Sequence, residues 1–129
     1  MANGKWLDED LSRESSVPLA SLIESVAYYK DKEPAPDFGA YYGVKPVKII
    51  SDVYVGIMYS YLLSELEGEA DDIIDGYAHL LWQNLFTLIG YTTHDGEKFD
   101  AYRNPGRNVT VEIGAQKVDG EDCITVFVT

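Results

Sequence analysis

Three side chains in the middle of the chain have the spacing of a metal-binding stripe on a helix. Asp71, Asp75 and His79 follow one another at intervals of four residues, so a helix would place them on one face. Carboxylates and imidazoles are ligands of divalent cations, and Glu65 and Asp52 are the candidates for completing such a site. We expect no metal site and no metal-dependent hydrolysis, because these acids crowd around a turn between two expected helices instead of facing each other.

The cysteine and the second histidine also lack a catalytic setting. Cys123 is the only cysteine, which excludes an internal disulfide and a cysteine-built zinc site. The neighbouring Asp122 would raise the pKa of its thiol, which is unfavourable for a nucleophile. His94 stands beside Asp95 in a polar stretch that is typical of a loop. With no nucleophile-elbow, dinucleotide or phosphate-loop motif, we expect a protein that is not an enzyme and uses no cofactor.

A polar turn near the C-terminus could bind an anion. Arg103, Asn104, Arg107 and Asn108 surround a Pro-Gly pair. Two guanidinium groups with neighbouring amides suit a phosphate or carboxylate. One hypothesis is therefore a protein that sequesters an anionic, nucleotide-like small molecule. The same residues are also typical of a polar hairpin that balances nearby acids.

The charge distribution is the most distinctive feature of the sequence. The chain has 22 acidic and 10 basic residues, for a net charge of −12, and neither Lys nor Arg occurs between Lys48 and Lys98. Six acids fall within eleven positions: Glu65, Glu67, Glu69, Asp71, Asp72 and Asp75. Such a segment can be a solvated surface that maintains solubility. It can also be a recognition surface, because no neighbouring cation offsets its charge.

Aromatic residues near this segment favour recognition. The chain has ten tyrosines, and on a helix one side would carry two sets of residues: the apolar Trp82, Phe86 and Ile89, and the polar Asp71, Asp75 and His79. Aromatic anchors surrounded by charge are typical of protein-binding surfaces. The alternative is that Trp82 and Phe86 pack inside the protein.

The partner of such a surface would be basic, and proteins that process nucleic acid have basic surfaces. The negative net charge argues against direct binding of nucleic acid by this chain. We expect a non-enzymatic inhibitor that acts as a nucleic-acid mimic and occludes the nucleic-acid-binding surface of its partner. Immunity proteins of nuclease toxins and phage anti-defence proteins use this principle. A third hypothesis is a structural protein that forms a homo-oligomer through strand edges.

The apolar runs predict no membrane segment. The run at 53–63 is interrupted by Ser60 and is shorter than the roughly 20 residues that cross a bilayer. The first ten residues contain acids instead of the basic start and apolar run of an export signal. We therefore expect a cytoplasmic protein.

These side chains must be positioned by the elements of a single domain, which we place at 16–129 after a loosely ordered segment at 1–15. Apolar residues recur at helical spacing in three segments, which predicts helices at about 17–30, 47–67 and 70–89. The first carries Leu19, Leu22, Ile23 and Val26 on one stripe. The β-branched residues of the second leave a strand possible for its first half.

The last third of the chain changes to a period of two. Alternating apolar residues predict strands at about 97–103, 108–117 and 122–129. The turns between them carry Asn104-Pro105-Gly106 and Asp119-Gly120. The expected fold class is therefore α+β, with three helices followed by a three-stranded antiparallel β-meander.

Overall fold

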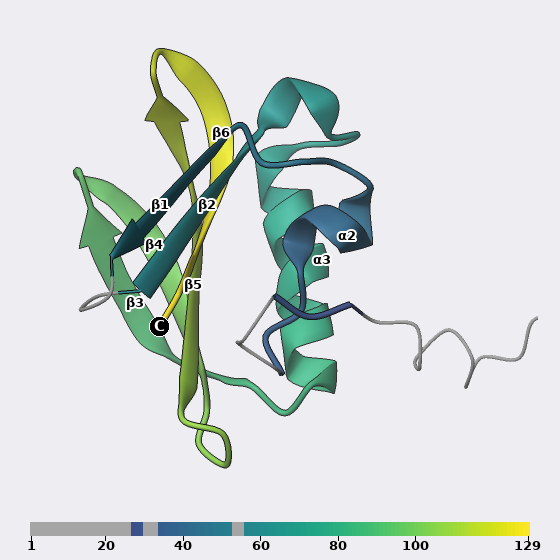
Figure 1. Cartoon of the computed structure of the whole chain (residues 1–129), viewed down its shortest axis with the longest axis vertical. Helices are drawn as coiled ribbons and strands as arrows, with labels where there is room; N and C mark the ends of the chain where they lie inside the picture. Colours follow the sequence, from purple (N-terminus) through teal and green to yellow (C-terminus); the bar gives the residue numbers. More distant parts are fainter. Residues whose placement is uncertain (1–26, 30–33, 53–55) are drawn as a thin grey trace, which may run out of the picture.

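The computed structural model describes residues 27–29, 34–52 and 56–129, which form an antiparallel sheet with helices against one face (Figure 1). The strands lie in the order β1-β2-β6-β5-β4-β3. Their bounds are β1 Lys48–Asp52, β2 Gly56–Leu62, β3 Thr87–His94, β4 Glu97–Asn104, β5 Val109–Val118 and β6 Glu121–Val128. The helical elements are α2 Phe38–Tyr42, the 3-10 helix η1 Leu63–Glu65 and α3 Ala70–Gln83.

The main core lies between the sheet and its helices. Alternate residues of the two central strands face it, each with 1% or less of its surface exposed: Val111, Ile113, Ile124, Val126 and Val128. The buried residues of α3 pack against them: Ile73, Tyr77, Leu80 and Leu81. Because residues three and four apart share a helix face, α3 turns its opposite face to solvent.

Tyrosines occupy the part of this core beside α2. The hydroxyls of Tyr29 and Tyr61 share a hydrogen bond of 2.7 Å, and Tyr77 donates one of 2.7 Å to the carbonyl of Pro36. Burial raises the pKa of all three phenols, because an ionised phenolate is poorly solvated there. These bonds connect the chain before α2 to the sheet and to α3.

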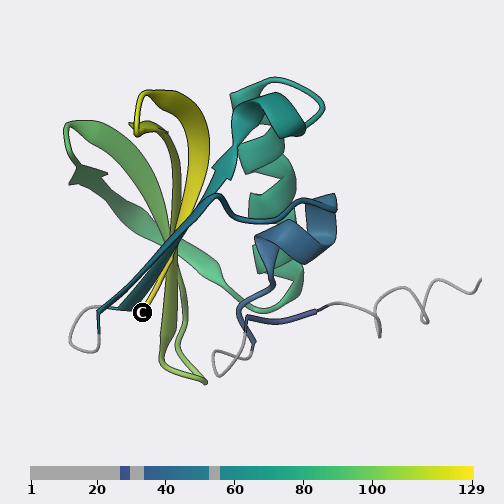
Figure 2. The same ribbon diagram turned by 45° about the horizontal axis from the view of Figure 1, so that its top comes forward.

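A second, smaller core lies on the other face of the sheet. Phe99 and Thr125 are completely buried there, and Phe127 is nearly so. One groove on this face is lined both by Ile50 of β1 and by His94 of β3. Since these belong to the two edge strands, the sheet curls over this face, and Figure 2 shows its strong twist.

The expected arrangement of three helices followed by a meander is wrong. In the segment 47–67, predicted as a helix, the described residues include β1, β2 and η1, and Ile49 lies opposite Tyr59 where β1 pairs with β2. Strand β2 is also paired with β6, where Tyr61 lies opposite Ile124. A strand in the interior of a sheet can be apolar on both faces, so its residues do not show the alternation that identifies a half-exposed strand.

The helix predicted at 70–89 begins as expected but ends early. Helix α3 stops at Gln83, and Leu85 adopts a left-handed conformation with φ of 70°. Residues 87–89 belong to β3, and Gly90 lies in that strand beside a β-bulge. The apolar residues that recur at helical spacing are therefore divided between α3, which ends at Gln83, and β3, which begins at Thr87.

The remaining segments have mixed outcomes. Strands occupy the three C-terminal segments, but as β4, β5 and β6 of a larger sheet. The helix predicted at 17–30 lies mostly outside the described residues, as does the segment 1–15. Within it, residues 27–29 are described and are extended, with Tyr28 bridged to Pro36.

Candidate functional site

The acidic residues lie on η1, on the connection that follows it and on the first two turns of α3. All six are exposed: Glu65, Glu67, Glu69, Asp71, Asp72 and Asp75. Asp71 and Asp72 stand in the first turn of α3, where the helix dipole favours negative charge by about 0.3–1 kcal/mol each. We call these six residues the acidic face.

The charge of the acidic face is not neutralised locally. Among the described residues, the ion pairs join other side chains: Lys48–Asp119, His94–Glu112, Lys98–Asp100 and Lys117–Asp122. None of the six carboxylates makes an ion pair or side-chain hydrogen bond within the described part of the chain. Carboxylates of this kind keep their negative potential in the surrounding solvent.

A groove extends the acidic face toward the sheet. It has a volume of about 450 Å³ and lies between α3 and β4. Asp71 and Asp75 line it on the helix side, and Glu97 and Asp100 on the strand side. The one cation in its lining, Lys98, is 3.8 Å from Asp100, so the groove keeps a net negative charge.

Trp82 lies on the same outer face of α3 as Asp75, two turns further along the helix. Its side chain is 65% exposed, and its indole stacks on the His79 ring with 5.8 Å between centroids. Phe86, which the sequence grouped with Trp82, is completely buried. The helix ends between these two residues, so Phe86 turns into the core and is not available to a partner.

Exposed apolar side chains continue from Trp82 onto the edge strand β3. Leu85 is 76% exposed, and Leu88, Ile89 and Tyr91 are each more than half exposed. We call Trp82, Leu85, Leu88, Ile89 and Tyr91 the apolar patch. Sequence reasoning grouped Ile89 with Trp82, but placed it on a helix; it did not predict the exposure of Leu88 and Tyr91.

Leu85 is exposed because of the way in which α3 ends. The amide of Phe86 donates to the carbonyl of Leu81, and the amide of Leu85 donates to that of Trp82. This pattern is a Schellman motif, whose left-handed position is usually glycine. A leucine there carries a conformational cost of about 1–2 kcal/mol.

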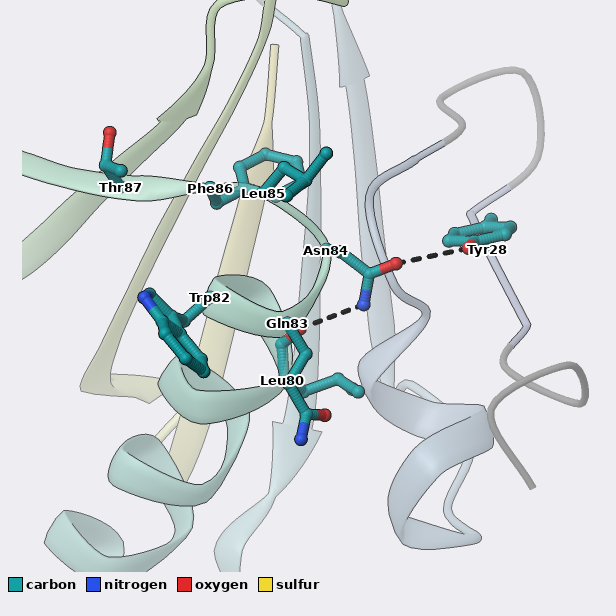
Figure 3. Close-up of a pocket in the computed structure, with 8 residues that line it drawn as sticks. All are labelled: Tyr28, Leu80, Trp82, Gln83, Asn84, Leu85, Phe86 and Thr87. Carbon is teal, nitrogen blue, oxygen red and sulfur yellow. Dashed lines mark hydrogen bonds between the residues drawn. The ribbon is translucent and has the colours of Figure 1, made fainter. Parts of the chain in front are cut away.

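A pocket opens beside this helix end (Figure 3). Its volume is about 580 Å³, and its lining includes Tyr28, Leu80, Trp82 and Leu85. The Tyr28 hydroxyl donates to Asn84 Oδ1 at 3.1 Å, and Asn84 Nδ2 donates to the carbonyl of Leu80 at 2.9 Å. Figure 3 shows Trp82 and Tyr28 on opposite sides of the helix end.

The residues of the predicted anion site have partners of their own. Arg103 donates to Asn108 at 2.5 Å and to Thr110 at 3.3 Å. Asn104 is buried, donates to the Asn84 carbonyl and accepts a bond from the Arg107 amide. The turn therefore uses much of its polar capacity to hold its own shape and to join β4 to the end of α3. Anion binding there stays a prediction.

The groups considered for catalysis lie apart from one another. Cys123 is buried, and burial together with Glu121 and Asp122 raises the pKa of its thiol. His94 contacts Glu112 on the opposite face of the sheet from α3, with 2.5 Å between Nε2 and Oε1. Among the described residues, no three His, Cys, Asp or Glu side chains are grouped closely enough to hold a metal ion.

No helix in the described part of the chain is long and apolar enough to cross a membrane. Comparison of the chain with protein-family models, with curated proteins and with solved structures found no match.

Proposed function

We propose that this chain is a non-enzymatic binding protein that inhibits a basic, nucleic-acid-processing partner by occluding its nucleic-acid-binding surface. One observation carries the proposal: six exposed carboxylates without side-chain partners among the described residues lie before and along the first turns of α3, and two of them, Asp71 and Asp75, share a helix face with the exposed Trp82. The proposal assigns the chain no catalytic residue, cofactor or metal, and places it in the cytoplasm.

The two parts of this surface would contribute differently to binding. Exposed charge accelerates the approach of an oppositely charged partner and selects among partners. Its contribution weakens as salt shortens the screening length, which is about 10 Å at 0.1 M ionic strength. Trp82 would supply the buried anchor, because exposed aromatic residues that become desolvated contribute much of the binding energy of an interface.

The acidic face also fits the surface of a nucleic-acid enzyme in its chemistry. Lysines and arginines that neutralise phosphates can accept carboxylates in their place, since both are oxygen anions that take charge-assisted hydrogen bonds. Helix α3 has 14 residues and is therefore about 21 Å long. Its acidic N-terminal half and Trp82 near its C-terminal end can contact one partner at two points along that length.

The test uses two triple variants of equal charge. Glu69→Gln, Asp71→Asn and Asp75→Asn neutralise part of the acidic face, and Asp119→Asn, Glu121→Gln and Asp122→Asn neutralise the β5–β6 turn. Each variant changes the net charge from −12 to −9, because three negative charges are removed. Both are compared with the parent as competitors of DNA for a panel of purified nucleases and other DNA-binding enzymes.

We expect the parent to displace DNA from at least one enzyme. The acidic-face variant should lose roughly ten-fold or more in affinity, whereas the turn variant should lose much less. The association rate of the parent should fall as salt rises. Equal losses in the two variants, or association that salt does not affect, would contradict the proposed surface.

A further inference from the structure

Strand β3 forms one edge of the sheet, and within the described part of the chain only β4 pairs with it (Figure 1). The strand has eight residues, and all of them except Gly90 and His94 are exposed. An edge strand presents a row of backbone N–H and C=O groups with which a further strand can pair. The open side of β3 is therefore a surface on which another strand can dock.

The turn that follows β3 determines which backbone groups point to this open side. Asp95 and Gly96 have positive φ, 51° and 82°, which is typical of a two-residue hairpin turn of type I′. Such a turn directs the backbone groups of His94 toward β4. The direction alternates from one residue to the next, so Tyr91 and Thr93 present their N–H and C=O groups to the open side.

The charge of β3 distinguishes it from the rest of this acidic protein. The strand contains no Asp, Glu, Lys or Arg, whereas the chain has a net charge of −12. The other edge strand, β1, has Lys48 and Asp52 at its ends, and charges of this kind protect a sheet edge from pairing. Since two copies of so acidic a chain repel each other in most orientations, the uncharged edge is where they can approach.

We propose that two copies of the chain pair through β3 and join their sheets into one. The copies run antiparallel about a two-fold axis beside Thr92, which places Tyr91 of each copy opposite Thr93 of the other. In this register the outward-pointing backbone groups of both strands meet. An antiparallel edge is self-complementary about such an axis, which favours a second copy over an unrelated strand.

The size of the contact indicates a weak, reversible dimer. Tyr91 is 69% exposed, and a tyrosine side chain can bury about 150–250 Å². The threonines on either side of it are smaller. Pairing of two such strands therefore belongs with the interfaces below about 1,200 Å² in total, which are typical of transient association.

Salt should strengthen this dimer, because it screens the repulsion between two acidic copies. The association of the acidic face with a basic partner should instead weaken as salt rises. The two proposals therefore predict salt effects of opposite sign, and the inference does not rest on the proposed inhibitory function.

The test compares two double variants of equal charge in the full chain. Tyr91→Glu with Thr93→Glu places each new carboxylate opposite one of the other copy. Ile49→Glu with Ser51→Glu places two carboxylates at exposed positions of β1. Each variant changes the net charge from −12 to −14, because two negative charges are added. Sedimentation equilibrium measures the mass, and circular dichroism checks that the variants are folded.

We expect the mass of the parent to rise with concentration from the 14.4 kDa of one chain toward twice that value. The β3 variant should dimerise roughly ten-fold more weakly or less, whereas the β1 variant should stay close to the parent. Tyr91→Lys with Thr93→Lys should also be a monomer by itself. An equal mixture of this variant with the β3 glutamate variant should restore the dimer, because each carboxylate then faces an ammonium group.

Several results would overturn the inference. One is a parent that stays a monomer at its highest soluble concentration in high salt. Others are equal weakening by the two glutamate variants, or a mixture of glutamate and lysine variants that stays monomeric. Exchange of the Tyr91 and Thr93 amides with solvent should slow as the dimer forms. Slow exchange at concentrations where the chain is a monomer would show that another part of the same chain covers β3.

Discussion

The buried tyrosines of the main core predict that the protein unfolds in alkali. Tyr29, Tyr61 and Tyr77 each have a phenol pKa raised by burial above the usual value of 10.0. In the unfolded chain, the same phenols ionise near pH 10. Their contribution to stability is therefore complete below pH 10 and is lost as the pH rises from 10 toward the folded-state values.

The size of this loss follows from the number of phenols. Each phenol that ionises only in the unfolded chain removes about 1.4 kcal/mol of stability per pH unit above 10, so three remove about 4 kcal/mol per unit. A domain is stable by about 5–15 kcal/mol. We therefore expect an unfolding midpoint between about pH 11 and pH 14.

The assay follows phenolate absorbance and far-UV circular dichroism through one alkaline titration. The ionisation of the last tyrosines should coincide with the loss of ellipticity. Tyr77→Phe should reduce the loss to about 3 kcal/mol per pH unit, whereas Tyr91→Phe, which removes a hydroxyl from an exposed side chain, should leave the slope unchanged. Complete tyrosine ionisation in a protein that keeps its folded ellipticity would refute the reasoning.

Two further predictions concern backbone geometry. Leu85→Gly should raise the stability by about 1 kcal/mol, because glycine tolerates the left-handed position. Leu85→Ala removes most of the same side chain but keeps the strain, so a rise in Tm for alanine as large as that for glycine would count against a backbone origin. Gly114→Ala should lower the stability by about 1–3 kcal/mol, because a Cβ there would lie 2.7 Å from the Lys98 carbonyl oxygen and 2.8 Å from the Phe99 ring. Gly106→Ala is the matched control in the same chemical-denaturation measurement, since its Cβ would meet nothing closer than 3.5 Å; equal losses at the two positions would show that the crowding at Gly114 has no effect.

The sequence could predict those elements whose periodicity is determined by one buried face. In β5, Val111 and Ile113 are buried toward the helices, and Glu112 between them lies on the other face. The pairing of β2 with β6 had no comparable signal. It joins residues as distant in the sequence as Tyr61 and Ile124, and no local pattern records which strands become neighbours.

Some features of the candidate site could likewise be predicted from the sequence, and others could not. Exposure of the acids could be predicted, because a carboxylate without a partner is costly to bury. The different positions of Trp82 and Phe86 could not, since both fit one helical stripe and separate only because α3 ends between them. The apolar patch on β3 becomes visible only once residues 87–94 are known to form an edge strand.

The end of α3 connects stability to the proposed binding surface. Leu85 exposes most of an apolar side chain and also holds a left-handed backbone conformation that glycine would adopt with less strain. Neither the exposed leucine side chain nor its left-handed backbone stabilises the fold of the described residues. Strained positions persist where surrounding structure or a bound partner compensates for them. Contact between Leu85 and the proposed partner of the acidic face would offset both costs.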